Sequence, residues 1–541
     1  MQQETTGNTA SAVWRYRRWL VWSLLLLLIA WAIFVRAWAV SERPFWVDEA
    51  WVAYAATQQS YGQLFRQTDL PMPPLFAAAT KLLGSIVGPP ELGLRLLPIA
   101  CGIACVPLGY LILRTLRVPG SVALAAMSLT ASSYILVRWS RELKQYEVEA
   151  FLSLLAALVV LRIRYCRPLR RRWLHRICLI AICLAGPWLG YGFVFPAAVL
   201  VAVMILLSPE VGERRESIIT GLLALTALAV STAVVLYVAA GLQGRQPALI
   251  AFMPQWFINP LDVRSWLRAA FHACVCLSVL LFPWEWAENL SLLDSAVYAG
   301  LIALVICLLA TVGLWAWPGR GRRDVACWII GPWLLTLLAG VAHRYPFAQP
   351  RMTAFLAAPL ILAVATGLVR IGRECFLLLN ARGGRGIAAA FILTLAPVFY
   401  MINAPLRNEY CVYHDFPVLL EILNKQRQPG DLLVVSYLAG PPVRFYIGRG
   451  GDPVVYVPNT AGSLPDLDYD YNTLAAETSG RSRNHWWVLC TSNDLAFKAR
   501  RDKLLDWVAK QGYRLELVAE GGKPTTAGVG QLFRVTGPAD R

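Results

Sequence analysis

Charged residues are scarce in this chain of 541 residues. Asp, Glu, Lys and Arg make up 15% of it, against about 25% in an average soluble protein. Hydrophobic residues make up 57%, and the mean hydropathy is +0.51. This composition excludes an ordinary soluble enzyme and an intrinsically disordered protein, and it indicates that much of the chain is solvated by a lipid bilayer.

Common metal-binding and nucleotide-binding signatures are also missing. The five His are scattered, and none of the 12 Cys shows the C-x-x-C spacing of a zinc or redox site. The acidic loop 466–477 resembles a calcium loop only superficially, because Tyr471 stands where that loop needs Gly. There is no Walker sequence and no GxGxxG after a strand. We therefore expect no metal site and no cofactor.

Long apolar runs alternate with arginine-rich segments. A membrane-spanning helix needs about 20 mostly apolar residues. Eleven candidate runs lie at 19–36, 92–113, 121–137, 147–161, 174–190, 192–208, 217–240, 296–317, 325–342, 352–369 and 386–403. Because arginines follow alternate runs, the positive-inside rule predicts a cytoplasmic N-terminus, and an odd number of spans predicts an extracytoplasmic C-terminus. We interpret 266–283, which carries Arg268 and His272, as an interfacial or re-entrant helix.

The pattern changes after Asn403, where hydrophobicity falls. Short β-rich runs then alternate with amphipathic stretches, which predicts strands at 432–437, 454–457, 486–490, 515–518 and 531–535 and helices at 415–426 and 493–510. We divide the chain into a transmembrane domain, 1–406, and a soluble extracytoplasmic α/β domain, 407–541. Cys411 and Cys490 either form a disulfide there or remain free thiols. The predicted fold class is a polytopic α-helical membrane protein with about 11–13 transmembrane helices and a C-terminal soluble α/β domain.

The first predicted outer segment carries two adjacent carboxylates among aromatic residues. Asp48 and Glu49 lie in the sequence 44–51, directly after the first apolar run. A carboxylate at the membrane surface can accept a proton from a hydroxyl or an amine. The alternative is an interfacial aromatic belt followed by a helix with an acidic first turn.

The second outer segment, 138–147, is rich in ionisable groups at the mouth of a membrane helix. Arg141 and Lys144 are three residues apart, so on a helix they would share a face and could hold a phosphate. Glu142 and Tyr146 are candidate supporting residues. The alternative is that the long side chains snorkel to the interface.

The third outer segment, 343–352, breaks the positive-inside trend. Arg351 opens the tenth span from outside, and a planar guanidinium suits a phosphate oxyanion. His343, Arg344 and Tyr345 are candidate supporting residues, and snorkelling is again the alternative. Taken together, a carboxylate pair and several cations suit group transfer from a lipid-linked phosphate, because the leaving group is anionic.

Three segments resemble the amino-terminal signature of the GT-C glycosyltransferases. Residues 45–51, 71–76 and 92–98 are similar, as an ordered set, to the branch that includes protein O-mannosyltransferases and lipid A aminoarabinose transferases. The stretches 140–146 and 345–351 also resemble segments of bacterial members. The resemblance covers roughly residues 20–370, and the trailing soluble domain is a common appendage of the family.

The resemblance implies an enzyme that transfers a sugar from a polyprenyl phosphate donor with inversion at the anomeric centre. It assigns the general base to Asp48, with Glu49 beside it. The family often has a Lys directly before the Pro-Pro pair, and here Met72 stands there. The donor phosphate is therefore expected on Arg141, Lys144 and Arg351.

The predicted spans and the family resemblance also indicate the partners and the cellular location. We expect a multi-pass protein of a bacterial-type inner (cell) membrane, whose partners are the bilayer, the donor and an extracytoplasmic lipid, glycan or protein acceptor. No nucleic-acid partner is expected. The alternative functions are a transporter or flippase, and a receptor-like module whose outer domain binds a glycan. Against a transporter, the sequence shows no pair of related halves, and its ionisable groups gather at one face rather than at the midplane.

Overall fold

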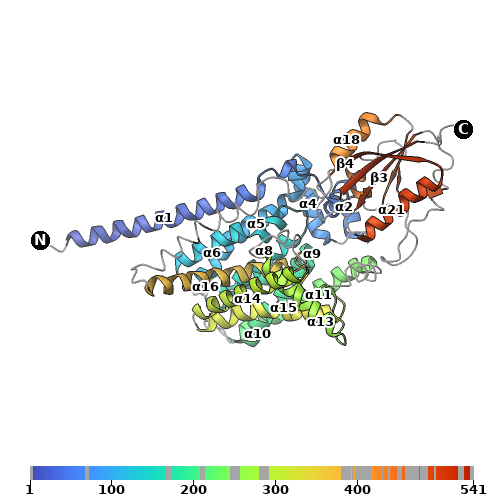
Figure 1. The fold of residues 1–541 in the computed structure, drawn as a ribbon. Coiled ribbons are helices and arrows are strands. Elements are labelled where there is room, and N and C mark those ends of the chain that lie inside the picture. The colour runs from blue at the N-terminus through green and yellow to red at the C-terminus, as the bar shows by residue number, and fades with distance from the viewer. Residues whose placement is uncertain are drawn as a thin grey trace.

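The structure is a computed structural model. It describes residues 4–66, 72–165, 172–207, 214–243, 256–279, 292–317, 319–378, 392, 395, 416–428, 431–436, 439–447, 454–456, 474–475, 485–492, 495–521 and 529–536. A long helical bundle occupies most of the molecule, and a small sheet with its own helices lies at one end of it (Figure 1). The N-terminus lies at the opposite end, at the tip of α1 (Figure 1).

The bundle is built from helices whose apolar residues match the runs in the sequence. Their bounds are α1 Glu4–Ala37, α2 Val47–Gln58, α3 Tyr61–Arg66, α4 Pro74–Ile86, α5 Pro90–Thr115, α6 Gly120–Ser132, α7 Tyr134–Ser140, α8 Tyr146–Tyr165, α9 Arg172–Leu189, α10 Val194–Leu206, α11 Arg214–Gln243, α13 Val263–Ser278, α14 Leu292–Ala316, α15 Gly319–Val341 and α16 Ala357–Leu378. Three short 3-10 helices connect them: η1 Val40–Glu42, η3 Tyr191–Phe193 and η6 Ala354–Leu356.

The polytopic helical class is confirmed. Ten of the eleven predicted spans coincide with these helices, and the eleventh, 386–403, falls outside the described residues apart from two single positions. Six described helices are long and apolar enough to cross a membrane, and α6 with α7 makes a seventh if this pair, bent by 52°, is one span. At 16 residues, α13 is shorter than a span needs.

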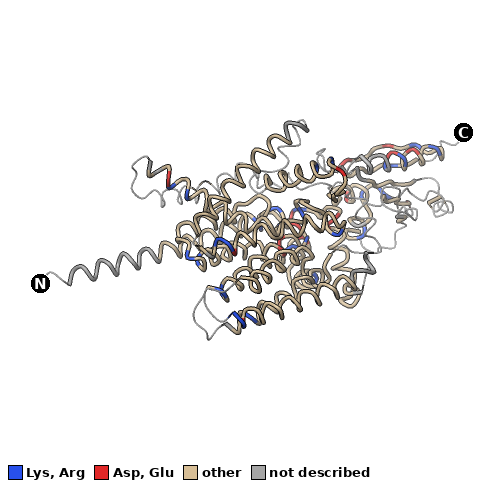
Figure 2. Tube along the Cα trace, turned by 90° about the horizontal axis from the view of Figure 1, so that it is seen from below, with Lys and Arg blue, Asp and Glu red and all other residues tan. Residues whose placement is uncertain are grey.

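Charges are distributed unevenly along the bundle. Most of its tube is uncharged. Charged residues, mainly positive, lie at the end nearer the N-terminus, and positive and negative residues also lie together in the part nearer the C-terminal sheet (Figure 2). Small residues let apolar helices approach closely in the rest of the bundle. A Cβ atom added to Gly313 of α14 would lie 1.9 Å from the carbonyl oxygen of Ala363 in α16, so this crossing requires glycine.

A buried ion cluster joins three helices at the end of α8. Arg164 donates to Asp324 of α15 from Nε at 2.7 Å and from Nη2 at 3.1 Å. The Tyr165 hydroxyl also donates to Asp324, and Arg164 Nη1 donates to the carbonyl oxygen of Leu207, just after α10. Both charged side chains are almost fully buried.

The C-terminal sheet contains the predicted strands. It consists of β1 Leu432–Val435, β2 Val454–Tyr456, β3 His485–Ser492, β4 Arg514–Gly521 and β5 Val529–Thr536, in the order β2-β1-β3-β5-β4. β1 pairs in parallel with β2 and β3, whereas β5 is antiparallel to both β3 and β4. The predicted soluble α/β organisation is therefore confirmed for the described strands.

Helices cover this sheet. Two of them, α18 Phe416–Gln426 and α21 Leu495–Lys510, were predicted from the sequence, whereas α19 Gly440–Tyr446 was not. Cys490 is a buried free thiol in β3, and Cys411 lies outside the described residues, as does the 406/407 boundary between the two predicted domains.

The sheet domain packs directly on α2. One apolar cluster contains Trp46 and Val47 at the start of α2 together with Val443 of α19 and Leu433 and Trp487 of the sheet. Figure 1 shows α2 between the bundle and the sheet. The start of α2, where Asp48 and Glu49 lie, is therefore held from both sides.

Candidate active site

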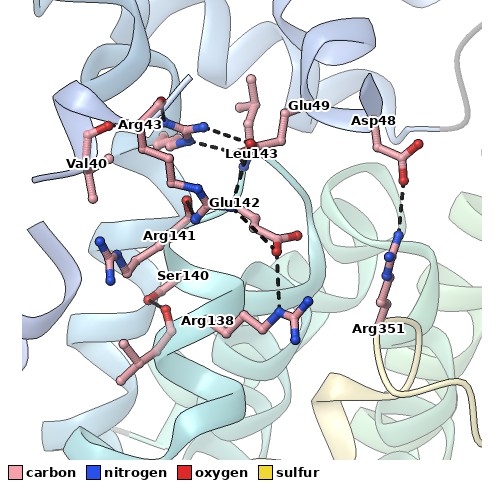
Figure 3. Close-up of polar contacts among 12 residues, drawn as sticks. Val40, Arg43, Asp48, Glu49, Arg138, Ser140, Arg141, Glu142, Leu143 and Arg351 are labelled. Atoms are coloured by element: carbon pink, nitrogen blue, oxygen red, sulfur yellow. Dashed lines mark hydrogen bonds and ion pairs between the residues drawn. The ribbon is translucent and has the colours of Figure 1, made fainter. Parts of the chain in front are cut away.

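The three predicted outer segments meet at one end of the bundle. Asp48 and Glu49 lie in the first turn of α2, and Arg351 lies just ahead of η6. The link between α7 and α8 lies beside them: Figure 3 shows its Glu142 close to Glu49 and Arg43, and Lys144 of the same link is within electrostatic reach of Asp48 and Arg351. The sequence therefore identified the segments that form this site.

Glu49 is a buried structural carboxylate. Its side chain is 0% exposed and accepts two hydrogen bonds from Arg95 of α5, from Nε at 2.9 Å and from Nη2 at 2.7 Å. The backbone N–H of Leu143 donates to the same carboxylate at 2.6 Å. Burial by itself would raise the pKa of Glu49, but the nearby charges of Arg95 and Arg43 outweigh it and lower the pKa. Glu49 therefore stays ionised and ties α2 to α5 and to the second outer segment.

Asp48, its neighbour, faces outward. Its side chain is 41% exposed and accepts a hydrogen bond on Oδ2 from Nη1 of Arg351 at 3.1 Å (Figure 3). Oδ1 accepts no hydrogen bond from the residues that the structure describes. One oxygen of Asp48 is thus held and the other is open to a substrate proton.

Arg351 is fixed by the fold of its own loop. The guanidinium lies over the Trp46 ring, 4.8 Å from its centroid, a cation–π contact. The Gln349 side chain accepts a hydrogen bond from the N–H of Met352, and the Thr353 hydroxyl donates to the Gln349 carbonyl. These contacts hold the loop so that Arg351 reaches Asp48 across 303 residues of sequence.

Lys144 is a buried cation without a partner. Lys144 is only 7% exposed, and its side chain forms no hydrogen bond or ion pair within the described part of the chain. Burial lowers the pKa of Lys144, the charge of Asp48 opposes that shift, and the charge of Arg351 adds to it. Lys144 is therefore within electrostatic reach of the Asp48–Arg351 pair while its own donors remain unused.

Glu142 is buried beside two arginines that do not fully satisfy it. Its Oε1 is 3.6 Å from Nε of Arg138 and 3.8 Å from Nη2 of Arg43, and neither carboxylate oxygen accepts a hydrogen bond from a described residue. Burial raises the pKa of Glu142, and the two arginines only partly counter this. Glu142 is thus the second carboxylate of the site.

Arg141 does not lie with the other cations. The shared face expected for Arg141 and Lys144 is wrong, because helix α7 ends at Ser140 and the link 141–145 is not helical. Arg141 Nη2 donates to the carbonyl oxygen of Trp38, and the side chain points away from Asp48 (Figure 3). The geometry thus separates the Arg141 side chain from the Asp48–Arg351 pair.

The remaining candidates lie around the site rather than in it. Tyr146 begins α8 and packs its ring on Trp139 at 5.6 Å. The Tyr345 hydroxyl donates to the carbonyl oxygen of Met352, which steadies the Arg351 loop. His343 and Arg344 are exposed, and no contact of either with Asp48 is recorded among the described residues.

Three contributors to the site were not assigned roles from the sequence. Arg95 and Arg43 hold Glu49, and Trp46 supports Arg351. A signal existed for Arg95, because a lone arginine inside an apolar run is costly in a membrane unless it is paired. Met72, at the position where the GT-C family often has lysine, is buried in the apolar core and supplies no cation.

The constellation is suited to acid–base and anion chemistry. It combines a partly exposed carboxylate, an arginine and a buried lysine that has no ion-pair partner in the described part of the chain. Among the described residues no group of three or more His, Cys, Asp or Glu is arranged to hold a metal ion. Most of the acidic loop 466–477 lies outside those residues.

Comparison with solved structures supports the fold resemblance. The chain is similar to ArnT from Cupriavidus metallidurans in the apo state, with 12% identity, a TM-score of 0.56, and coverage of 94% of this chain and 97% of that one. The undecaprenyl phosphate-bound form of that ArnT matches with 12% identity, a TM-score of 0.53 and the same coverage.

A second protein shares the fold. The oligosaccharyltransferase AglB from Archaeoglobus fulgidus, in complex with an inhibitory peptide and a dolichol-phosphate, is 11% identical with a TM-score of 0.52, covering 87% of this chain and 70% of that one. No protein-family model and no curated protein sequence matches the chain. The expected fold, which is the fold of ArnT and AglB, is thus confirmed.

Proposed function

We propose that this protein is a glycosyltransferase that uses a polyprenyl phosphate-linked sugar and transfers the sugar, with inversion, to an extracytoplasmic hydroxyl or amine. The donor site lies at the Asp48 end of the bundle. We further propose that the membrane is a bacterial-type inner membrane, with the N-terminus in the cytoplasm and the sheet domain outside.

One observation carries the proposal. Lys144 is buried, forms no hydrogen bond or ion pair with any residue that the structure describes, and lies within electrostatic reach of Asp48 and Arg351. A buried cation that forms no direct ion pair with a described residue is costly to maintain, and an anionic ligand that pairs with it would offset that cost. A phosphate monoanion or dianion at the end of a lipid chain matches both the charge and the position at the end of the bundle.

The reaction is a single displacement. The acceptor O–H or N–H attacks C1 of the sugar, and its proton passes to the open Oδ1 of Asp48. The bond between C1 and the phosphate oxygen breaks, and the polyprenyl phosphate leaves with the electron pair. Lys144 and Arg351 stabilise that developing negative charge. Glu49 does not touch substrate in this scheme, since both of its oxygens are already used to hold the fold.

The comparisons support the same donor class. Both similar structures were solved with a polyprenyl-type phosphate, undecaprenyl phosphate for ArnT and dolichol-phosphate for AglB. The likeness is one of fold at low sequence identity, so the donor of the present protein is assigned from its own cations. Arg141 is not included, because its side chain is directed elsewhere.

The test uses the purified full-length protein in lipid nanodiscs. Native mass spectrometry is expected to show bound undecaprenyl phosphate with wild type and with Asp48→Asn, and much less with Lys144→Gln. With a radiolabelled undecaprenyl phosphate sugar as the probe and acceptor-containing membranes, Asp48→Asn is expected to transfer about 100- to 10,000-fold more slowly.

Glu42→Gln is the matched control, because it changes an exposed carboxylate six residues before Asp48 to the same amide. It is expected to bind and transfer like wild type. Wild-type transfer by Asp48→Asn would remove Asp48 from the base role. Accumulation of intact substrate in sealed vesicles without covalent product would instead identify a transporter.

A further inference from the structure

The sheet domain contacts the backbone directly ahead of Asp48. Tyr446, the last residue of α19, accepts a hydrogen bond on its hydroxyl oxygen from the backbone N–H of Phe45, at 2.9 Å and across 401 residues of sequence. Phe45 is three residues before Asp48 and two before the start of α2. The contact therefore fixes the point where the chain enters the helix that carries Asp48.

The Phe45 ring links α19 to Glu49 through Arg95. The ring is fully buried, and Phe445 of α19 packs on it edge to face, with centroids 5.1 Å apart and planes at 85°. The guanidinium of Arg95 lies 4.5 Å from the Phe45 centroid, and Arg95 holds Glu49 through its two hydrogen bonds. A continuous series of contacts thus runs from α19 to the buried carboxylate of α2.

Trp46 provides a second series of contacts, which leads to Arg351. Its indole packs in the apolar cluster with Val443 of α19 and Trp487 of β3. The same ring lies under the guanidinium of Arg351, which donates to Asp48. Both partners of the Asp48–Arg351 pair therefore rest on residues that the sheet domain contacts.

The pair needs this support because it cannot hold itself in place. Its side chains are 41% and 31% exposed, and ion pairs in such settings contribute about 0–1 kcal/mol. A shift of about 1 Å in a reacting group can lower a rate about 100-fold. The rigid parts next to the pair are Phe45 and Trp46, which are buried against the sheet domain.

We propose that α19 is a positioning element of the active site: Tyr446 and Phe445 hold the Phe45–Trp46 segment so that Asp48 and Arg351 are aligned only while the sheet domain is docked on α2. The catalytic part of this inference rests on the proposed transferase function. Tyr446 touches no reacting atom in it and acts through Phe45. The sheet domain is then a working part of the site.

The test is Tyr446→Phe in the full-length protein in nanodiscs, measured in two ways. Hydrogen–deuterium exchange of peptides covering 44–58 is expected to become about tenfold faster or more, because the Phe45 N–H loses its acceptor. Transfer from the labelled undecaprenyl phosphate sugar is expected to show a kcat about 10- to 100-fold lower with a donor KM within about twofold of wild type. If Tyr446 only stabilised the fold, the variant would give less active protein, but the remaining folded protein would show neither faster exchange at 44–58 nor a lower kcat.

Tyr513→Phe is the matched control. Tyr513 stacks on Trp486 within the sheet domain's second apolar cluster and has no recorded contact with α2 among the described residues. It loses the same hydroxyl, and it is expected to leave both readouts unchanged. If Tyr446→Phe does not fold, Phe445→Leu keeps the Tyr446 acceptor and is expected to lower kcat about threefold to tenfold.

The outcomes separate the two proposals. Exchange and kcat unchanged in Tyr446→Phe, or kcat unchanged in Phe445→Leu, would overturn the positioning role. Faster exchange at 44–58 with no transfer even by wild type would overturn the transferase function while supporting the mechanical coupling. Faster exchange with a lower kcat would support both.

Discussion

Both ends of the helical bundle bring an arginine and an aspartate together from distant parts of the chain, but the two pairs differ in how completely they are satisfied. At the end of α8, Arg164 and Asp324 are 160 residues apart, almost fully buried and joined by two hydrogen bonds. At the sheet end, Asp48 and Arg351 are 303 residues apart, half-exposed and joined by one hydrogen bond.

The difference indicates different roles. The Arg164–Asp324 pair has further partners in the Tyr165 hydroxyl and the Leu207 carbonyl, so a substrate has little to add. In the Asp48–Arg351 pair, one carboxylate oxygen accepts no hydrogen bond from a described residue, and Lys144, within electrostatic reach, has no ion-pair partner among those residues either. A satisfied buried pair connects helices, whereas an incompletely satisfied exposed pair is available for chemistry.

The largest expected effect on stability comes from breaking the satisfied pair. Asp324→Asn leaves Arg164 as a buried charge with its main partner gone, which is expected to cost about 3–5 kcal/mol. Thermal unfolding of the purified protein in detergent checks this, with yield from membranes as a second measure. Glu374→Gln, in an exposed pair with Arg373, is the control and is expected to shift stability by about 1 kcal/mol or less. An Asp324→Asn protein as stable as wild type would show that the buried Arg164–Asp324 pair does not stabilise the fold.

The next effect is on catalysis at the open pair. Arg351→Gln is expected to lower kcat about 100- to 1,000-fold, because the leaving phosphate loses a donor and Asp48 loses its orienting partner. Stability is expected to change little, since the pair is half-exposed. Transfer kinetics and thermal unfolding measured on one preparation check both statements.

The exposed arginine of α13 provides the control for that variant. Arg264→Gln makes the same change outside the site and is expected to retain wild-type kinetics. If Arg351→Gln lowered the thermal stability by several kcal/mol while kcat stayed at the wild-type value, the roles assigned to the two ends would be wrong.

The smallest effect is a shift in pH dependence. Because burial lowers the pKa of Lys144, its charge is present at low pH and is lost earlier than that of an ordinary lysine as pH rises. The donor kcat/KM of wild type is therefore expected to fall on the alkaline side. Lys144→Arg is expected to move that fall upward by about one pH unit or more, because arginine stays charged. An alkaline limb identical in Lys144→Arg and wild type would remove Lys144 from donor binding.

Much of this molecule was predictable from residue patterns. Ten apolar runs of span length, separated by arginine-rich turns, coincide with described helices, since each such run must be buried or meet lipid. The strands and the two longer helices of the C-terminal domain follow from period and capping signals. The helix α19 was missed because seven residues beginning at Gly440-Pro441-Pro442 carry too little periodicity to recognise.

The site was predictable by segment and less so by residue. Asp48 and Glu49 look equivalent in the sequence, yet successive helix positions point about 100° apart, so one turns inward and the other outward. Which of them is buried depends on Arg95 and Leu143, which come from other segments. The predicted partnership of Arg141 and Lys144 failed because α7 ends before either of them.

The sequence by itself determined which parts of the chain meet lipid and which meet water. It also determined that a helical bundle is followed by an α/β domain, and which segments carry the candidate catalytic residues. All of this follows from hydropathy and local spacing, which are properties of neighbouring residues. Only the tertiary structure decided that Glu49 is structural and Asp48 is open, that Arg351 rests on Trp46, and that Tyr446 holds the entry to α2. Those contacts join residues separated by about 50 to 400 positions, and no local pattern encodes which distant side chain will bury, pair with or support another.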